Sequence, residues 1–424
     1  MLQAALESQP REALEALQLE RMRRSLARVT SHPAWRRRLG DARPEDLRAL
    51  EDWSRLPFLR KEELRDAYPF ELACVPRSAV LRVHMSSGTT GNPILNPYTR
   101  SDIDQWAEVM ARCYAAAGVT AKDVIQITPS FGLFTGGFGF HYGAERIGAM
   151  VIPIGAGRTA LQLRLMKELG ATVLTGIATY PLRLIEVARE EGFDLSQLRL
   201  RVAILGSEMW SEEIRKLIER ELGVESFDII GMTETGGPGL GIDCRAHEGI
   251  HLWEDHYYGE IIDPATGERH PDGAEGELVL STLTREGLPL IRYRTHDLTR
   301  VLSRQPCACG RTHLRLDRLR GRTDDMVIFK GVNFYPRQVE TLILRRPGVS
   351  HEYQILLERI GGADRMTVCV EVRPDFDPAE VQRLQQDFKN TLNVSPDIHI
   401  LEEGDIPRPQ GKAVRVVDQR AAPR

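Results

Sequence analysis

The chain has few cysteines for its length: six among 424 residues, too few to build a disulfide framework. It also lacks an excess of charge of either sign. The 56 Lys and Arg residues nearly balance the 60 Asp and Glu residues, and the formal net charge is -4. Nucleic acid and anionic membranes are therefore not favoured as partners.

Membrane and export signals are also missing from the expected places. The N-terminal stretch MLQAALESQPREALEALQLERMRR mixes charged with small apolar residues and lacks the continuous apolar core of a signal peptide. Residues 124–144 carry no Asp, Glu, Lys or Arg, but their five glycines and one proline make a poor membrane helix. We expect a buried Gly-rich loop there, in a cytoplasmic protein.

What the sequence does contain is a regular alternation of strand-like and helix-like runs. An amphipathic helix is predicted over 12–28, and apolar strands alternate with helices between 123 and 230. This alternation is typical of an α/β body with parallel strands. Within it, Ser211 is a good N-cap for a helix that should end at Gly223.

The pattern of strand-like, turn-like and helix-like runs changes twice later in the sequence, which indicates a subdomain and a second domain. From about Gly259, short strands and turns predict a β-rich subdomain, and after residue 322 a new set of strands and helices begins. We therefore predict an α/β protein with a large N-terminal domain, 1–322, of parallel sheets plus a β-rich subdomain. A small, mobile α+β domain should follow over 323–424.

The stretch RVHMSSGTTGNP, residues 82–93, concentrates hydroxyl residues and glycines. Such a turn presents backbone N–H groups and hydroxyls without side-chain obstruction, which suits the oxygens of a polyphosphate. It is not a Walker A loop, because no Gly-Lys-Ser/Thr follows Gly88. Since an ordinary solvated loop would have a similar composition, the surrounding motifs decide between the two interpretations.

Those motifs give the chain a family resemblance. SSGTTGNP resembles the phosphate loop of the acyl-adenylate-forming superfamily, and the later motifs resemble its phenylacetate-CoA ligase branch: FGLFTGGFGFHYGAER, LGSEMW, GMTETGGPG, GIHLWEDHYYGEIIDPATGE, IRYRTHDLTR, GRTDDMVIFKGVNFYP and IPRPQGKAVRVVD. The resemblance covers roughly 15–420. It implies an ATP- and Mg²⁺-dependent, AMP-forming ligase that joins an aryl or arylacetic acid to CoA through an acyl-adenylate. It also implies a homodimer.

The resemblance assigns roles to particular residues. Lys412 would be the adenylation lysine, Glu234 the Mg²⁺ carboxylate, and Thr233 a contact of the α-phosphate. Asp324 would be the hinge about which the C-terminal domain turns, and Gly331 would line the CoA tunnel. The nucleotide-binding residues that it implies are Ser86, Ser87, Gly88, Thr89, Thr90, Gly91, Gly206, Ser207, Glu208, Ile230, Gly231, Met232, Asp297 and Arg322.

Aromatic residues supply a candidate pocket for the acid. A slot lined by aromatic rings favours a flat, apolar acid, although plain core packing would give the same composition. The candidates are Phe131, Phe134, Phe138, Phe140, Tyr142 and Tyr180.

Three positions depart from the family pattern. Ile230 stands where the superfamily usually has a Tyr that stacks on adenine, and Ile94 follows Pro93 where a Lys is often found. TGIATYPL also differs from the TPSYAL kind of segment expected of phenylacetate enzymes. The identity of the acid and the adenine platform therefore stay open.

The segment QPCACGRTH indicates a metal knuckle. Cys307 and Cys309 flank one residue, and the following glycine allows a tight turn, so two more ligands would complete a tetrahedral site. Cys244 and His251 are the best candidates, with His247 and His313 as rivals. Because adenylation needs no zinc, a Cys₃His zinc ion would be structural; unliganded thiols in a loop are the alternative.

Three other functions compete with the ligase. The same adenylating site could serve a non-CoA acceptor, in amide formation or the adenylylation of a cofactor. A dehydrogenase is a second competitor, because the segment MVIPIGAGRTALQL satisfies the G-x-G-x-x-A pattern of a dinucleotide-binding turn. However, no acidic residue lies where the carboxylate that binds the ribose should fall. A non-catalytic relative is disfavoured because the implied catalytic residues are all present.

Overall fold

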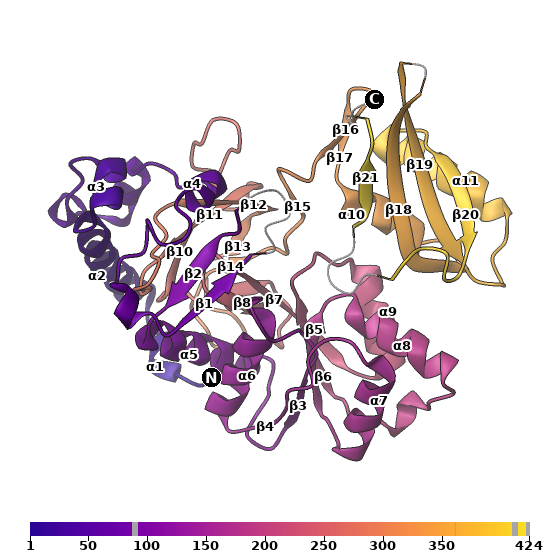
Figure 1. Ribbon diagram of the computed structural model, residues 1–424, viewed down its shortest axis with the longest axis horizontal. Coiled ribbons are helices and arrows are strands. Elements are labelled where there is room, and N and C mark those ends of the chain that lie inside the picture. Colours follow the sequence, from indigo (N-terminus) through magenta and orange to yellow (C-terminus); the bar gives the residue numbers. More distant parts are fainter. Residues whose placement is uncertain (87–91, 361, 409–413, 421–424) are drawn as a thin grey trace. The chain divides into compact units, whose positions relative to one another are not determined.

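The computed structural model describes residues 1–86, 92–360, 362–408 and 414–420, which form two compact units (Figure 1). Unit 1 comprises Met1–Gly176, Ser196–Ser207 and Val224–Leu319; unit 2 comprises Ile177–Leu195, Glu208–Gly223 and Arg320–Arg424. Contacts thus group two segments of the predicted N-terminal domain with the C-terminal residues. Among the described helices, none combines the length and the apolar character that crossing a membrane requires.

Unit 1 contains most of the regular structure. Its helices are α1 Ala4–Glu7, α2 Arg11–Thr30, α3 Pro33–Leu39, α4 Lys61–Asp66, α5 Arg100–Ala116, α6 Gly136–Ile147 and α7 Thr159–Glu168. Its strands are β1 Arg82–Met85, β2 Leu95–Tyr98, β3 Val124–Ile127, β4 Met150–Ile152, β5 Val173–Ile177, β6 Val202–Gly206, β7 Glu225–Met232, β8 Gly237–Asp243, β9 Ile250–Leu252, β10 Tyr257–Ile262, β11 Gly276–Thr282, β12 Tyr293–Thr299, β13 Val301–Ser303 and β14 Arg315–Leu316.

The main sheet of unit 1 has nine strands in the order β13-β14-β9-β8-β7-β6-β5-β3-β4. β3 pairs in parallel with β4 and β5, and β6 pairs in parallel with β7, which confirms the predicted parallel α/β body. From β7 onward the pairing is antiparallel, through β8, β9 and β14 to β13. β10, β11 and β12 pair antiparallel in a second sheet, as the predicted β-rich subdomain requires.

The glycine-rich stretch at 124–144 corrects a prediction, because its second half is the helix α6 and not a loop. The glycines of α6 face α5 and its neighbours at very short range. A Cβ on Gly143 would lie 2.5 Å from the Met110 Cβ, and one on Gly139 would lie 2.7 Å from the Trp106 ring. Close packing therefore explains the glycines, and tertiary contacts outweigh their low helix propensity.

Unit 2 combines α8 and α9 with the C-terminal residues. Its helices are α8 Tyr180–Glu190, α9 Glu212–Leu222, α10 Pro336–Leu344 and α11 Ala379–Asp387, and its strands are β15 Gly321–Arg322, β16 Val327–Phe329, β17 Val332–Phe334, β18 Val349–Ile360, β19 Ala363–Val372, β20 Asp397–Glu402 and β21 Val416–Asp418. A sheet in the order β20-β19-β18-β21 shares one apolar core with α10 and α11 (Figure 1). The predicted caps of α9 are confirmed: the Ser211 Oγ accepts from the Ile214 N–H at 3.2 Å, and Gly223 has a φ of 66°.

Candidate active site and metal cluster

The turn that follows β7 carries Thr233 and Glu234, and buried side chains from other elements hold it. Asn96 on β2 donates from its Nδ2 to the carbonyl oxygens of Thr233 and Glu234, at 2.5 and 3.1 Å. Arg285 donates to the Asn96 Oδ1 at 2.8 Å, and the Tyr293 hydroxyl donates to the Glu234 Oε1 at 3.4 Å. Both turn residues are buried, so the position of the Glu234 carboxylate is fixed by the fold.

Five of the predicted nucleotide-binding residues lie together at the carboxyl ends of two neighbouring strands. Gly206 ends β6 and Ser207 follows it, and 230–232 end β7, its parallel partner. A Cβ on Gly206 would lie 2.1 Å from the Ile229 carbonyl oxygen, and one on Gly231 would lie 2.3 Å from the Gly237 carbonyl oxygen. Close backbone packing therefore requires glycine at both positions, at the ends of parallel strands where α/β sheets bind ligands.

The predicted phosphate loop is described only at its first residue. The Ser86 backbone N–H donates to the Ile94 carbonyl, and the Ile94 N–H donates to the Ser86 Oγ, both at 3.0 Å. These two bonds close the base of the loop. The following residues of the loop and the predicted adenylation lysine lie outside the described residues: Ser87, Gly88, Thr89, Thr90, Gly91 and Lys412.

Other predicted nucleotide contacts are distributed over both units. Asp297 is a buried residue of β12 in unit 1, and its backbone N–H donates to the Thr295 Oγ1 at 3.0 Å. In unit 2, Glu208 accepts from the Thr179 hydroxyl at 2.8 Å. Arg322 forms a two-pronged pair with Asp324, through Nε at 2.8 Å and Nη2 at 2.9 Å. The predicted hinge residue is thus an ion partner of a predicted nucleotide contact.

Three residues predicted for the acid pocket form an aromatic cluster, which consists of Phe131, Phe138 and Tyr142. The rings of Phe131 and Phe138 meet edge to face at 5.4 Å, and those of Phe138 and Tyr142 stack at 6.1 Å. Phe140 is not part of it, because its ring packs in the core against Tyr114. Tyr180 is the first residue of α8 in unit 2, and Gly331 lies in the turn between β16 and β17 with a φ of 80°.

Sequence reasoning missed two β1 residues that touch the aromatic cluster. The Arg82 guanidinium lies over the rings of Phe138 and Tyr142, at 4.8 and 4.9 Å from their centres. His84 meets the Phe138 ring at 5.5 Å, and burial lowers the pKa of its imidazole to about 4, so the ring is neutral at pH 7. Alternate residues of a strand share a face, and this spacing in RVHM was the signal that could have found them.

The turn at Gly155 and Gly157, which matched a dinucleotide-binding pattern, forms its hydrogen bonds with another residue of this chain. The buried Gln162 donates from its Nε2 to the carbonyl oxygens of Gly155 and Gly157, at 2.8 and 3.0 Å. Its own amide also meets Gln126 at 3.1 Å. The glycines therefore serve an internal hydrogen-bonded turn between β4 and α7.

The four residues of the predicted zinc site do come together, and we call them the Cys–His cluster: Cys244, His251, Cys307 and Cys309. One ligand atom from each lies within 4.8 Å of all the others. The Sγ atoms of Cys244 and Cys307 are 3.7 Å apart, and the Cys309 Sγ is 3.5 Å from the His251 Nε2. Hydrogen bonds from Cys244 and His251 lower the pKa of the Cys309 thiol.

Both rival histidines have other partners. The His313 Nδ1 accepts from the Glu254 N–H at 2.9 Å, so its Nε2 carries the proton that it donates to the Leu6 carbonyl at 3.1 Å. His247 lies between Asp243 at 2.9 Å and Glu225 at 3.1 Å. Of the three candidates, the structure brings His251 to the thiols.

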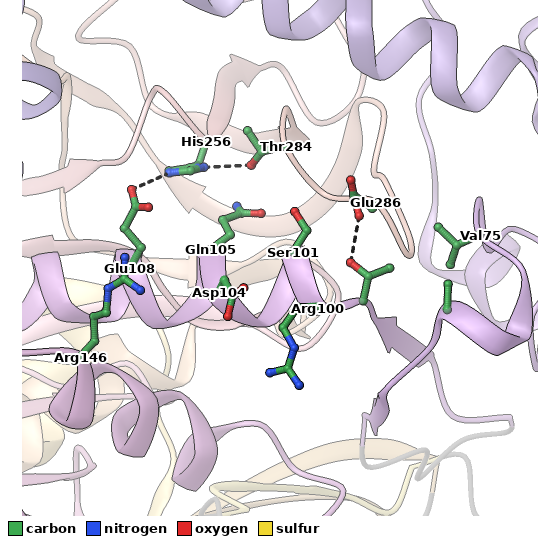
Figure 2. A pocket seen from close by; sticks show the side chains of 12 residues that line it. Val75, Arg100, Ser101, Asp104, Gln105, Glu108, Arg146, His256, Thr284 and Glu286 are labelled. Atoms are coloured by element: carbon green, nitrogen blue, oxygen red, sulfur yellow. Dashed lines mark hydrogen bonds and ion pairs between the residues drawn. The ribbon is translucent and has the colours of Figure 1, made fainter.

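A second group with metal-ligand chemistry, the acid cluster, consists of Glu108, Asp255 and His256. The buried Arg112 donates from its Nη1 to both oxygens of Asp255, at 2.9 and 3.0 Å, and also pairs with Glu108. Figure 2 shows His256 between Glu108 and Thr284, on the wall of a polar pocket of about 750 Å³. Among the residues that the structure describes, none predicted for adenylation lines this pocket.

The chain matches known proteins along nearly its whole length. A family model described as AMP-binding enzyme matches 17–284, and one described as AMP-binding enzyme C-terminal domain matches 331–420. Phenylacetate-coenzyme A ligase from Aromatoleum evansii is 42% identical over 98% of this chain and 96% of its own. That from Escherichia coli K12 is 42% identical over 96% and 95%.

Solved structures agree with the sequence comparison. A 2-hydroxyisobutyryl-CoA ligase, in the postadenylation state with an acyl-AMP, superposes with a TM-score of 0.91 at 27% identity over 98% of this chain and 92% of its own. The adenylate-forming fold predicted from the sequence is thereby confirmed. The chain belongs to the phenylacetate-CoA ligase family of AMP-binding enzymes.

Proposed function

We propose that this protein is an ATP-dependent, AMP-forming ligase that joins an aryl or arylacetic acid to CoA. The observation that carries the proposal is the 42% identity, over nearly the whole chain, to enzymes named phenylacetate-coenzyme A ligase. The aromatic cluster supports an aromatic acid, because stacked and edge-to-face rings bind flat apolar groups well. The names of these relatives favour CoA over another acceptor.

The reaction has two steps. In the first, a carboxylate oxygen of the acid attacks the α-phosphorus of ATP, the new P–O bond forms, and pyrophosphate leaves. In the second, the CoA sulfur attacks the acyl carbon, and AMP leaves with the electron pair of the broken C–O bond. Both steps demand positioning and neutralisation of negative charge more than covalent help from the protein.

Roles follow for the residues around the turn after β7. Glu234 fits a Mg²⁺ ligand, since it is a buried carboxylate of fixed position and Mg²⁺ prefers oxygen ligands. Bound Mg²⁺ would neutralise phosphate charge. Thr233 would donate to the α-phosphate and Asp297 would accept from the ribose hydroxyls. Asn96 is a positioning residue, because it holds the backbone of the turn.

The C-terminal domain, 323–424, would change its orientation between the two steps of the reaction. Lys412 would bring one ammonium to the α-phosphate and the carboxylate during adenylation, and a rotation about Asp324, at the boundary between 1–322 and 323–424, would replace it with the hairpin that carries Gly331. The pair with Asp324 holds Arg322 through its Nε and Nη2 atoms. Neither step requires zinc, so the Cys–His cluster stands outside this proposal.

The first test is a measurement of AMP and pyrophosphate release with MgATP over a panel of aromatic and aliphatic acids, with and without CoA. We expect AMP formation that depends on an aromatic acid and on CoA, with the acyl-CoA product confirmed by its mass. Pyrophosphate release without consumption of CoA would instead favour a different acceptor. Absence of turnover with every acid would contradict the proposal.

The role of Lys412 has its own test. Lys412→Ala should lower the rate of acyl-adenylate formation by about 100-fold, because one charged donor at a phosphoryl-transfer site contributes on this scale. Thioester formation from supplied acyl-adenylate should change little. Lys389→Ala, at an exposed position, is the matched control and should keep both rates. If Lys412→Ala adenylates at the wild-type rate, the assignment of this lysine is wrong.

A further inference from the structure

The Cys–His cluster has the dimensions of a tetrahedral zinc site. Zn–S bonds of about 2.3 Å and Zn–N bonds of about 2.0–2.1 Å at tetrahedral angles place two sulfurs about 3.8 Å apart, and a sulfur and a nitrogen about 3.6 Å apart. The observed separations are 3.7 Å between the Cys244 and Cys307 sulfurs and 3.5 Å between the Cys309 sulfur and the His251 Nε2. Packing of unliganded thiols does not require these values.

The surroundings suit thiolates bound to a cation. The backbone N–H of Cys309 donates to the Cys307 Sγ at 3.5 Å, and Arg311 donates from its Nη1 to the Cys309 Sγ at 3.5 Å. The knuckle itself is closed by the Gly310 N–H to the Cys307 carbonyl, at 2.8 Å. Gly310 has a φ of 87°, a conformation that suits glycine. Hydrogen bonds of this kind orient the ligands of a metal.

Burial removes three of the four residues of the cluster from solvent, whereas Cys309 is partly exposed. Cys244 and His251 are fully buried, and Cys307 is 5% exposed. Three thiolates with one Zn²⁺ would have a net charge of -1, and Arg311, which also pairs with the buried Glu7 carboxylate, donates to one of the three sulfurs. The acid cluster shows the contrast, because there the buried Arg112 already neutralises the carboxylates.

The same loop holds the N-terminal segment of the chain. Arg311 donates from its Nε to the buried Glu7 carboxylate at 2.7 Å, and the Thr312 N–H donates to the Glu7 carbonyl at 3.0 Å. The Thr312 hydroxyl donates to the Gln9 carbonyl at 2.7 Å, and His313 donates to the Leu6 carbonyl. The position of 6–9 therefore depends on the conformation of 309–313.

We propose that the Cys–His cluster binds one structural zinc ion, which joins the β8–β9 edge to the loop between β13 and β14 and thereby fastens the N-terminal segment. A bound ion would fix three separate parts of the chain at one point. Its loss should loosen the loop and the segment that it holds, while the adenylation residues at the ends of β6 and β7 keep their positions.

Metal content tests the proposal on the full-length protein without a histidine tag. We expect about one zinc per chain by elemental analysis, and a tetrahedral thiolate spectrum when the zinc is exchanged for Co²⁺. Cys309→Ser should lose most of the zinc and lower the Tm by about 5 °C or more. Cys369→Ser, on β19, is the matched control and should keep the zinc.

A second variant separates loss of the site from failure to fold. His251→Cys replaces one good zinc ligand with another, so it should keep about one zinc per chain, whereas His251→Ala should lose it. Limited proteolysis should cleave the zinc-free protein faster within 1–11 than the zinc-bound protein. A zinc-free native protein without a tetrahedral Co²⁺ spectrum would overturn the proposal. A Cys244–Cys307 disulfide in the protein isolated under reducing conditions would also overturn it.

Discussion

The Cys–His cluster and the acid cluster both gather metal-ligating side chains, the first mainly sulfurs and the second mainly carboxylate oxygens, but their buried charges have different partners. In each, the ligand atoms lie within 4.8 Å of one another. The acid cluster contains a cation of the chain itself, since the Arg112 guanidinium contacts both oxygens of Asp255. In the Cys–His cluster the nearest arginine contacts one sulfur, and the proposed zinc ion would occupy the centre between the four ligands.

This difference teaches that proximity of ligands alone does not identify a metal site. A buried carboxylate must be neutralised, and an arginine or a metal ion can do so. Where a guanidinium already fills that role with two short hydrogen bonds, a metal ion would have to displace it. The counter-charge therefore distinguishes the two sites better than the ligand set does.

Among the changes that test this difference, removal of the Arg112 charge should lower the unfolding free energy most. Arg112→Gln leaves the buried Asp255 carboxylate with a longer contact to a second arginine, Arg21 at 3.8 Å. Breaking one partner out of a buried ion pair costs about 3–5 kcal/mol of unfolding free energy. Urea unfolding of the wild type and the variant measures it.

A surface pair provides the control for that measurement. Arg24 and Glu20 form an exposed pair on α2, with both side chains more than half exposed. Arg24→Gln should therefore change the unfolding free energy by less than about 0.5 kcal/mol. Equal costs for the Arg112 and Arg24 variants would show that the acid cluster does not depend on its arginine, and the comparison would fail.

The second largest loss of unfolding free energy should come from low pH, because Asp255 of the acid cluster is then protonated. Burial by itself raises the pKa of Asp255, but the charges of His256 and Arg112 outweigh it and lower the pKa from 3.8 to about 2. A carboxylate with a lowered folded-state pKa stabilises the protein above its unfolded pKa, and this stabilisation is lost as the pH falls from about 4 to about 2. The expected loss is about 2 kcal/mol.

Unfolding free energies measured by urea between pH 6 and pH 2 would follow this loss. Asp255→Asn removes the titrating group, so the variant should show a shallower decline below about pH 4 than the wild type. Its stability at pH 6 should already be lower, because Arg112 loses its charged partner. Parallel pH profiles for the two proteins would contradict the lowered pKa.

Local signals in the sequence predicted the frame of the molecule well. The N-cap at Ser211, the stop at Gly223 and the alternation of strands and helices depend on neighbouring residues, and the structure confirms them. The Gly-rich stretch was wrongly predicted as a loop, because its helix depends on α5, which a sequence window does not contain. Helix propensity therefore predicts the local structure only where packing against distant residues does not override it.

The two clusters were unequally visible in the sequence. The CxC knuckle is a local pattern and predicted the Cys–His cluster, with Cys244 and His251 as the best further ligands. The pairing of β8 with β9 brings His251 to the cluster, and its rivals His247 and His313 have other partners. The acid cluster gave no signal, since Arg112 and Asp255 are 143 residues apart. The role of Asn96 was hidden for the same reason, because its partner Thr233 is 137 residues away.

The smallest effect on stability should come from the uncharged hydrogen-bond partner of the acid cluster, Thr284. The Thr284 hydroxyl meets the His256 Nδ1 at 2.9 Å in Figure 2, and Thr284→Val removes this hydrogen bond while it keeps the shape of the side chain. One part-buried hydrogen bond contributes about 1 kcal/mol, so urea unfolding should show a loss of that size. Zinc content should stay at its wild-type value, because His256 would bind no metal. If the Thr284 variant lost zinc, the two clusters would not be independent, and the difference in counter-charge could not explain which of them takes a metal ion.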